Sequence, residues 1–315
     1  MGGEKIVFTP LVSIVFLSYN QVDYVEDSLK SLFFQDYNNI EIIVSDDGSN
    51  DGTKELIDIL VCDYNGFKKI IINDIRENIG LVENFNSAVA LCHGEYIAVA
   101  AGDDISYPSR ISDSVKAFQQ FDGISMLSFM DDRIDESGKL TFTSKKNKNH
   151  RYGIDDLIKG KYVSNNAASR IFKRCVYTSF GALSCDCKTE DTTYLVRSLL
   201  CGDVLELCIP GIKYRIHGKS LSYSHSFCKF DYSKIIKQYS SDINKAYCDN
   251  LIENCCYNKL IDWLSCYGEY RRYQQMILFG NSAFCFVQIV FSKISFAYKY
   301  RLFRVLARKI VFGLV

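Results

Sequence analysis

The first half of the chain alternates between short apolar runs and longer segments in which apolar residues recur every three or four positions. The short runs are rich in β-branched residues, as in strands buried on both faces, and cover residues 11–17, 40–44, 69–72 and 96–100. The longer segments have the spacing of amphipathic helices and cover residues 22–34, 53–62 and 81–92. This alternation predicts βαβ units with right-handed crossovers and a mainly parallel sheet flanked by helices.

The second half has a less regular pattern and ends in helices. Residues 111–121 are predicted to form a helix and residues 125–130 an apolar strand, while the lysine-rich residues 145–151 are predicted to form a loop. A short strand over residues 212–216 precedes residues 226–275, which have a helical pattern. The alternation of strand and helix therefore stops well before the end of the chain.

These patterns predict an α/β domain over residues 1–225, with halves at 1–110 and 111–225, and a helical region over residues 226–315. The 315 residues are enough for both parts with a sizeable core. Hydrophobic residues make up 48% of the chain and charged residues 23%, which is ordinary for a globular protein and argues against long disordered segments.

Charge is balanced over the whole chain but not along it. With 37 basic and 37 acidic residues the formal net charge is +0, so no overall positive field would recruit nucleic acid. The last acidic residue is Glu269, and eight basic residues follow it. Residues 1–269 therefore carry a net charge of −8, and the remaining residues carry +8.

The basic end of the chain is amphipathic. Residues 276–291 are apolar but number only 16, fewer than the roughly 20 needed to cross a bilayer. Beyond them an apolar helical face is predicted from Phe303, Leu306, Ile310 and Leu314, with Arg301, Arg304 and Arg308 on the opposite face. Such a helix is typical of one that lies on an anionic membrane surface. The alternative is that it packs on the acidic N-terminal part with its basic side chains in water.

The cysteine pattern indicates free thiols. The 13 cysteines are odd in number, are absent from the first 61 residues and include no Cys-x-x-Cys pair, so neither a disulfide framework nor structural zinc is expected. The first ten residues lack a basic segment followed by an apolar one, as a secretory signal would have. We expect a cytoplasmic protein, peripheral on the inner face of the cell membrane.

Two acidic pairs follow predicted strands. Asp46-Asp47 follows the second strand and Asp103-Asp104 the fourth, at the strand ends where ligands bind in open α/β sheets. Adjacent carboxylates repel each other unless a cation or hydrogen-bond donors compensate. Asp46 and Asp47 also fit an ordinary turn that caps the helix at residue 53. Asp103 and Asp104 suit oxygen coordination of Mg²⁺ or Mn²⁺, although turns carry acidic residues for other reasons too.

Five motifs in order make the sequence resemble a known family. They are Ser18-Tyr19-Asn20, the residues Val44 to Thr53 (VSDDGSNDGT), Asn78-x-Gly80, Gly94-Glu95-Tyr96-Ile97 and Gly102-Asp103-Asp104. Together they resemble the inverting family 2 glycosyltransferases, of the bacterial cell-surface polysaccharide type, which have the Rossmann-like GT-A fold. The resemblance runs from about Val12 to about Ser222, roughly two-thirds of the chain.

The resemblance implies a donor pocket after the first two strands. Asp47 matches the carboxylate that hydrogen-bonds the nucleotide base. Ser18 and Tyr19 match residues that line the same pocket, and Asn20 and Asn78 are expected to contribute to donor binding. The first half, residues 1–110, would thus bind the nucleotide sugar.

The resemblance also implies a divalent metal, Mn²⁺ or Mg²⁺, as cofactor. The family's metal motif is commonly Asp-x-Asp, but its first position is Ala101 here. This shortened form leaves Asp104 as the expected metal ligand and places Asp103 nearer the ribose or the donor sugar.

The second half of the domain, residues 111–225, supplies the expected base. Glu190-Asp191 precedes an apolar helical pattern, and the resemblance assigns the catalytic base to Asp191. The partial positive charge of a helix N-terminus favours an ionised carboxylate, which could accept a proton. The alternative is that Thr189 or Asp191 only caps the helix.

The downstream motif Tyr214-Arg215-x-His217-Gly218-x-Ser220 also matches the family. Arg215 is expected to contact the donor diphosphate, or otherwise to pair with the acidic body of the protein. His217 is expected to contact the metal or the diphosphate, or otherwise to be a polar loop residue.

The predicted function is transfer of a hexosyl or N-acetylhexosaminyl group from a nucleotide-diphosphate sugar, with UDP favoured. The expected acceptor is a saccharide, in particular a lipid-linked oligosaccharide in the biosynthesis of a surface polysaccharide such as O-antigen or capsule. The loop predicted at residues 131–162 and the helical residues 226–275 would shape the acceptor site. Alternatives are a polyprenyl-phosphate glycosyltransferase, which would normally bring transmembrane helices, and a catalytically inactive fold that acts in binding or assembly.

Overall fold

The computed structural model describes residues 9–161, 167–218, 231–279 and 282–312, without the side chains of residues 282–285 and 310–312. The chain divides into two compact units. The first, here called the sheet unit, comprises Met1–Arg151, Asn165–Leu183 and Val204–Ile216. The second, the helical unit, comprises Tyr152–Ser164, Ser184–Asp203 and His217–Val315. The predicted boundary between residues 225 and 226 lies outside the described residues.

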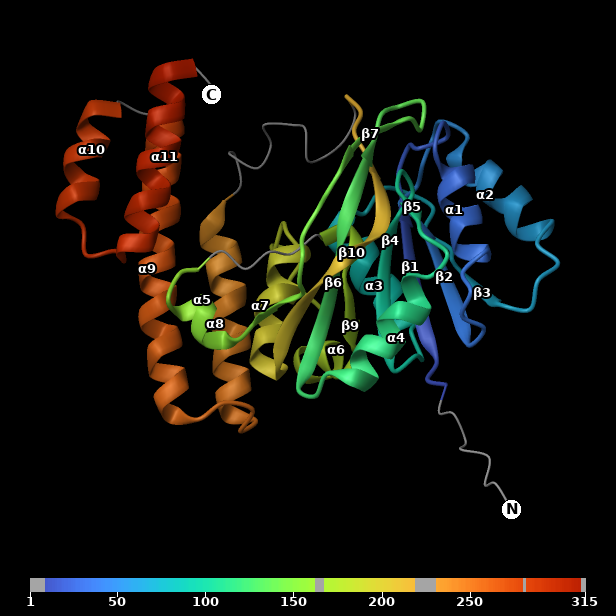
Figure 1. Cartoon of the computed structure of the whole chain (residues 1–315), viewed down its shortest axis with the longest axis horizontal. Helices are drawn as coiled ribbons and strands as arrows, with labels where there is room; N and C mark the ends of the chain where they lie inside the picture. The colour runs from blue at the N-terminus through green and yellow to red at the C-terminus, as the bar shows by residue number, and fades with distance from the viewer. Residues whose placement is uncertain (1–8, 162–166, 219–230, 280–281, 313–315) are drawn as a thin grey trace. The chain divides into compact units, whose positions relative to one another are not determined.

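Four parallel strands form one side of the sheet in the order β3–β2–β1–β4. They are β1 (Val12–Ser18), β2 (Ile40–Asp46), β3 (Lys69–Asn73) and β4 (Tyr96–Ala101). Every residue of β1 and β2 is buried, because both faces of a parallel sheet are covered. The connections run through α1 (Val25–Phe33), α2 (Thr53–Cys62) and α3 (Leu81–Ala90) (Figure 1). The predicted parallel strands and their helices are confirmed, with ends that differ by a few residues at most.

Antiparallel strands extend the sheet beyond β4, so the whole sheet is mixed. β9 (Ile171–Lys173) pairs with β4, and β6 (Ile124–Ile134) pairs with β9, both antiparallel. The sheet continues through β10 (Asp203–Arg215) to the two-residue β5 (Ile105–Ser106). Two helices of the sheet unit are α4 (Arg110–Gln120) and α6 (Arg174–Phe180), and a 3₁₀ turn covers Ala167–Ser169.

Two sequence-based expectations for this region need correction. The residues 131–162 form no single loop, because they contain the end of β6 and three further elements: β7 (Leu140–Thr143), β8 (His150–Tyr152) and α5 (Ile154–Ile158). The strand predicted at residues 212–216 is the end of β10, which has 13 residues. All four residues of β7 (LTFT) are exposed. The alternation of apolar and polar residues in this strand is only four residues long, and neither of its faces packs on a core.

The helical unit is built around α9 (Asn254–Phe279), which contacts both α8 (Tyr232–Cys248) and α11 (Phe296–Phe312). Figure 1 shows α9 and α11 running side by side. Aromatic side chains fill this region, and Trp263 Nε1 donates a hydrogen bond of 2.9 Å to the Tyr298 hydroxyl. The predicted helical stretch 226–275 is interrupted between α8 and α9, where Asn250 adopts a left-handed φ of 57°, a conformation that asparagine tolerates.

A buried ion pair joins α7 (Asp191–Cys201) to α8. Arg197 Nε and Nη2 donate to the Asp242 carboxylate at 2.8 and 3.1 Å, and Gln238 donates to the same group at 3.0 Å. Burial raises the pKa of Asp242, while the contacts with Arg197 and Gln238 act in the opposite direction. The pair fixes how these two helices pack.

The apolar face of the last helix is already covered. Tyr298, Leu302 and Leu306 of α11 are buried against Tyr270 and Ile277 of α9. Of the face predicted from sequence, Leu306 is buried and Phe303 is partly buried in this cluster, whereas the side chains of Ile310 and Leu314 are outside the described set. The face predicted to meet a membrane or the acidic N-terminal part therefore packs on α9. In the part of the chain that the structure describes, no helix is both long and apolar enough to span a bilayer.

Candidate functional site

The loops after β1 and β2 are held together by hydrogen bonds to Asp46. The Asp46 carboxylate accepts from the Ser18 hydroxyl at 2.8 Å and from the Ser49 backbone N–H and hydroxyl at 2.8 and 2.7 Å. The Ser49 hydroxyl in turn accepts from the Asn20 backbone N–H at 2.8 Å. Asp46 thus shapes the turn.

Asp47 bonds to the segment before α3. Its two oxygens accept from the backbone N–H groups of Ile79 and Gly80 at 2.8 and 3.1 Å. Burial raises the pKa of Asp47 and the charge of Asp46 adds to this effect, while the two N–H bonds lower the pKa. Each carboxylate oxygen has a second lone pair, so Asp47 can still accept from a bound base. Asp47 directly follows β2, and its role in binding a base stays a prediction.

Neither Asp46 nor Asp47 caps α2, so the capping alternative is wrong for this pair. The N-cap residue is Gly52, and Asp51 just before it accepts from the backbone N–H of Thr53, the first residue of the helix, at 3.0 Å. Burial raises the pKa of Asp51, but the hydrogen bonds from Thr53 outweigh it and hold the pKa below the ordinary value.

Gly48 lets the loop before α3 approach the end of β2. Its φ is +67°, and a Cβ there would lie 2.5 Å from the Glu77 carbonyl carbon and 2.7 Å from the Asn78 nitrogen. Only glycine fits such a position. Asn78 is exposed beside it, and Tyr19 after β1 is 45% exposed. The structure thus gathers Ser18, Tyr19, Asn20, Asp47 and Asn78 at one edge of the sheet.

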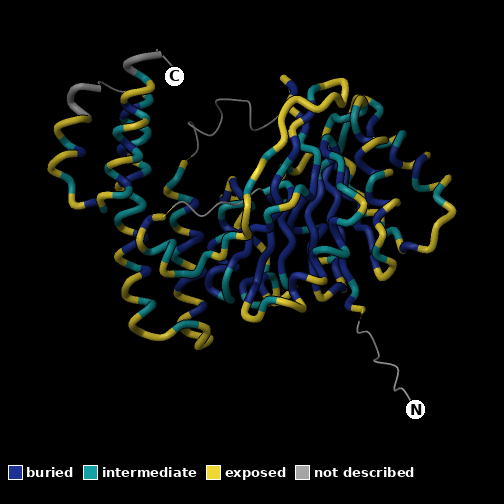
Figure 2. The backbone as a smooth tube through the Cα atoms, in the orientation of Figure 1, coloured by how far each residue is buried: buried dark blue, intermediate teal, exposed yellow. Residues whose placement is uncertain are grey.

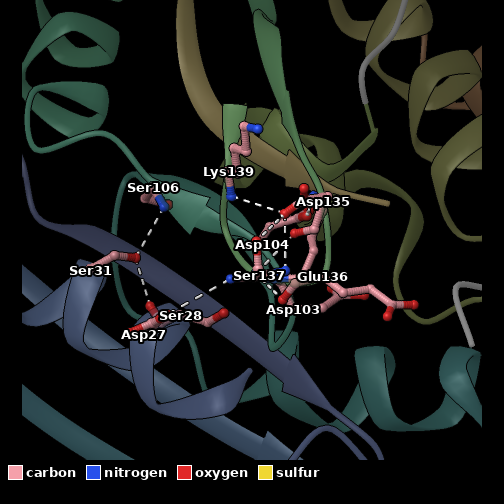
Figure 3. Close-up of polar contacts among 11 residues, drawn as sticks. Asp27, Ser28, Ser31, Asp103, Asp104, Ser106, Asp135, Glu136, Ser137 and Lys139 are labelled. Atoms are coloured by element: carbon pink, nitrogen blue, oxygen red, sulfur yellow. Dashed lines mark hydrogen bonds and ion pairs between the residues drawn. The ribbon is translucent and has the colours of Figure 1, made fainter. Parts of the chain in front are cut away.

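Asp104, three residues beyond β4, is a buried carboxylate with one oxygen unpaired. Its Oδ1 accepts from the Arg215 backbone N–H at 2.9 Å, whereas Oδ2 has no hydrogen-bond partner among the described residues. Burial, and then the charge of Asp103, raise the pKa of Asp104 well above its ordinary value, against the effects of Arg215 and Arg110. Figure 3 shows Asp103 and Asp104 beside the turn that carries Asp135 and Glu136.

These residues fit a divalent cation. The unpaired Asp104 oxygen lies next to a second carboxylate, and a hard cation with oxygen ligands would offset both charges. Within the described ranges no group of three or more histidine, cysteine or acidic side chains could hold a metal ion by itself. A cation held by Asp104 would complete its coordination with water or phosphate oxygens, as Mg²⁺ commonly does.

Arg215 is buried below this site and bonds to backbone. Its Nε donates to the Asp103 carbonyl at 3.0 Å, and Nη1 donates to the carbonyls of Asp135 and Glu136 at 3.2 and 3.0 Å. The guanidinium lies 4.8 Å from the centroid of the Tyr24 ring. The structure therefore favours a positioning role for Arg215 over the predicted contact with the diphosphate. An ion pair to Asp27, with Nη2 and Oδ2 3.8 Å apart, agrees with the alternative of pairing within the acidic body.

Sequence reasoning missed Arg110, the first residue of α4. This side chain is 1% exposed and donates to the Ser106 hydroxyl at 3.0 Å and the Val99 carbonyl at 2.7 Å. Its charge partly offsets that of Asp104. An arginine at the start of an amphipathic helix usually lies in water, so the pattern gave no signal of this buried position.

The predicted base and the predicted histidine belong to the helical unit. Asp191 is the first residue of α7, and its Oδ1 accepts from the Thr192 backbone N–H at 2.6 Å. The N-cap position of α7 is Glu190, and a bond to the N–H of the next residue does not make Asp191 the cap. The base role of Asp191 stays a prediction. The role of His217 also stays a prediction, and Ser220 of the same motif lies outside the described residues.

The acidic residues after β2 and β4 lie at the carboxyl ends of parallel strands, the edge where open α/β sheets bind ligands. A family model described as Glycosyl transferase family 2 matches residues 13–177, more than half of the chain. The chain belongs to glycosyl transferase family 2.

Curated relatives match over part of their length. An uncharacterised glycosyltransferase of Haemophilus influenzae is 35% identical over 119 residues, which are 38% of this chain and 36% of the relative. An uncharacterised glycosyltransferase of Rickettsia typhi is 34% identical over 115 residues, 36% of this chain and 34% of the relative. The alignments thus span about a third of the relatives.

Solved structures show the GT-A fold. TarS (residues 1–349) of S. aureus, in complex with UDP, superposes with a TM-score of 0.62 at 15% identity over 89% of this chain and 78% of TarS. The mannosyltransferase PcManGT of Pyrobaculum calidifontis, in complex with GDP-Man and Mn²⁺, has a TM-score of 0.53 at 14% identity, covering 98% of this chain and 88% of that enzyme. At these identities the similarity concerns the fold alone.

Proposed function

We propose that the protein is an inverting glycosyltransferase that uses a nucleotide-diphosphate sugar, with UDP favoured as the nucleotide. The observation that carries the proposal is the buried Asp104 oxygen without a partner, on the same sheet edge as Asp47 in a chain of this family. TarS has been solved with UDP and with UDP-GlcNAc, and PcManGT with GDP-Man and Mn²⁺, which supports a donor of this class.

The sheet unit would bind the donor. Asp47 would accept a hydrogen bond from the base, with Ser18, Tyr19, Asn20 and Asn78 around it. Asp104, with Asp103 beside it, would hold Mn²⁺ or Mg²⁺, and a divalent ion bound there supplies neutralising charge for the leaving diphosphate. Arg215 would keep Asp103 in place through the Asp103 carbonyl.

Asp191 would act as the base. Its carboxylate would remove the proton from an acceptor hydroxyl, whose oxygen attacks the anomeric carbon on the face opposite the leaving diphosphate, so that the configuration inverts. A diphosphate whose charge is neutralised needs no acid to protonate it, so one positioned base is enough. Inverting hydrolases differ, because they need two carboxylates.

We further propose that the transferred group is hexosyl or N-acetylhexosaminyl. The acceptor would be a saccharide, in particular a lipid-linked oligosaccharide for a surface polysaccharide such as O-antigen or capsule. Family resemblance supports this acceptor class, and the basic, aromatic end of the chain is suited to working near a lipid surface.

Donor hydrolysis tests the proposal. The purified chain would be incubated with UDP-, GDP- and dTDP-sugars and Mn²⁺ or Mg²⁺, without acceptor, and release of nucleoside diphosphate followed. We expect slow, metal-dependent release from one donor, reduced about 100-fold or more in Asp104→Asn, which removes charge stabilisation at the leaving group. Asp58→Asn, on the exposed face of α2, is the matched control and should retain wild-type rates.

The alternatives predict other results. No release from any donor, together with no thermal shift by UDP or GDP, would overturn the proposal and favour a binding or assembly protein. Equal rates of donor hydrolysis in wild type and Asp104→Asn would show that Asp104 does not hold a metal ion needed for the reaction. With a lipid-linked saccharide acceptor, Asp191→Asn should abolish transfer but leave the thermal shift by UDP intact, which separates a base from a helix cap.

A further inference from the structure

The helix α10 (Ser282–Phe291) leaves apolar side chains in water. It contains no charged residue, and its side chains Phe286, Val287 and Val290 are 49%, 54% and 42% exposed. Ile289 is fully buried against the cluster that α9 and α11 share. The Phe286 ring also lies 5.4 Å from that of Phe303, centroid to centroid. The helix thus has one side packed on its neighbours, while Val287 and Val290 remain largely exposed.

The turn between α10 and α11 is flanked by two phenylalanines. Phe291 is 82% exposed and Phe296 is 84% exposed, the highest values among the large apolar side chains that the structure describes. Lys293 lies between them and is exposed. Lys299 donates to the Val290 carbonyl at 2.9 Å, which ties the end of α10 to the start of α11. Figure 2 shows exposed backbone on both sides of this turn.

The outward face of α11 continues this surface with basic and aromatic side chains. Tyr300 is 56% exposed, and the Arg304 guanidinium lies 6.0 Å from the centroid of its ring. Arg304 and Arg308 are both exposed. No acidic residue follows Glu269 in the sequence, so the positive charges of this face have no counter-charge from their own segment.

We propose that this aromatic–basic edge, defined by Val287, Val290, Phe291, Lys293, Phe296 and Tyr300, docks on an anionic lipid bilayer. Phenylalanine and tyrosine rings beside lysine and arginine are typical of surfaces that enter the headgroup region of anionic membranes. The ten residues of α10 are too few to cross the hydrocarbon core, so the edge would lie in the interface. The residues differ from the amphipathic face predicted from sequence, of which Leu306 is buried and Phe303 partly buried in the cluster with α9.

A second copy of the chain is the less favoured occupant. A symmetric contact through this edge would bring the two uncompensated basic faces together, because an isologous interface uses the same patch on both subunits. Like charges so placed repel each other. An anionic bilayer instead attracts each basic group near its surface.

Vesicle co-sedimentation of the full chain tests the proposal. The lipids would be phosphatidylcholine alone and phosphatidylcholine mixed with phosphatidylglycerol. We expect binding to the mixed vesicles that is weakened by salt. Binding should be reduced at least about tenfold in Phe291→Ser/Phe296→Ser, because this variant no longer transfers two aromatic rings from water into the bilayer. Lys293→Gln/Arg304→Gln should bind about 25-fold more weakly, since each basic group contributes roughly fivefold.

Matched controls distinguish docking through this edge from nonspecific binding through any exposed aromatic ring. Phe34 and Phe67 of the sheet unit are 73% and 72% exposed, so Phe34→Ser/Phe67→Ser removes equivalent rings elsewhere and should leave vesicle binding unchanged. Donor hydrolysis without lipid and the melting temperature should be the same in all variants, which separates this test from that of the proposed function. Absence of wild-type binding, or full binding by Phe291→Ser/Phe296→Ser, would overturn the proposal. Light scattering that shows an oligomer dissociated by this substitution, without vesicle binding, would assign the edge to self-association.

Discussion

At the scale of single residues, neighbouring carboxylates have opposite electrostatic environments in the sheet unit. Burial raises the pKa of Asp47, whereas the hydrogen bonds from Thr53 outweigh burial at Asp51 and lower its pKa. A group with a raised folded-state pKa loses its stabilising contribution as pH rises through that pKa. A group with a lowered one loses its contribution as pH falls. The two residues should therefore give the protein opposite dependences on pH.

This difference can be measured with Asp47→Asn and Asp51→Asn. From about pH 3 to about pH 6, a range that spans the ordinary aspartate pKa, wild type should become less stable relative to Asp47→Asn as the pH rises. Relative to Asp51→Asn it should become more stable. Urea unfolding at several pH values provides both comparisons, with each variant as the control for the other. Slopes of the same sign would contradict the assigned environments.

The sequence predicts which residues are candidates for the site, but it does not predict the hydrogen bonds and the burial that hold them in place. The pairs Asp46-Asp47 and Asp103-Asp104 stand out because polar residues directly after apolar strands reach the ligand-binding edge, and the family resemblance selects Asp47 and Asp104 within them. The bonds from Asp47 to Ile79 and Gly80 involve backbone N–H groups, which every residue has, so no side-chain pattern marks them. The burial of Arg110 and Arg215 depends on tertiary packing that local periodicity does not report.

At the scale of elements, strands buried on both faces were the easiest to predict. β1 and β2 are uniformly buried, so their sequences are continuous apolar runs. β7 is exposed throughout and was expected to be loop. The helix α11 was predicted correctly as a helix, but its apolar side packs on α9. Amphipathicity tells which side of a helix is covered, not what covers it.

Arg215 connects three elements, and its replacement should loosen all of them. It joins the end of β10 to the Asp103 carbonyl and to the turn between β6 and β7. Lysine keeps the charge but lacks the planar fork of donors. We expect Arg215→Lys to lower the free energy of unfolding by about 2 kcal/mol, the scale of a lost hydrogen bond to a charged donor.

Arg133→Lys is the control for that prediction. Arg133 lies in β6 with a side chain that is 50% exposed, and its replacement should change stability by no more than about 0.5 kcal/mol. Urea denaturation of both variants gives the comparison. Equal effects of the two substitutions would show that the carbonyl contacts of Arg215 contribute little.

At the scale of the whole molecule, charge and chemistry are segregated along the sequence. Residues 1–269 carry −8 and include every candidate catalytic and donor-binding residue, while the segment that follows carries +8. The overall composition conceals this asymmetry, which the positions of the charged residues along the sequence reveal. We propose that the acidic part transfers the sugar and that the basic end holds the enzyme at the lipid surface where its acceptor lies.

In the proposed function, the sheet edge binds a nucleoside diphosphate together with a divalent ion held by Asp104. Calorimetric titration of UDP and GDP into the chain, with and without Mn²⁺, tests it most directly. We predict that one of the two nucleotides binds, at least about tenfold more tightly with Mn²⁺, and that Asp104→Asn loses this metal enhancement while Asp58→Asn retains it. Nucleotide binding that is equal with and without Mn²⁺, or unchanged in Asp104→Asn, would contradict the account.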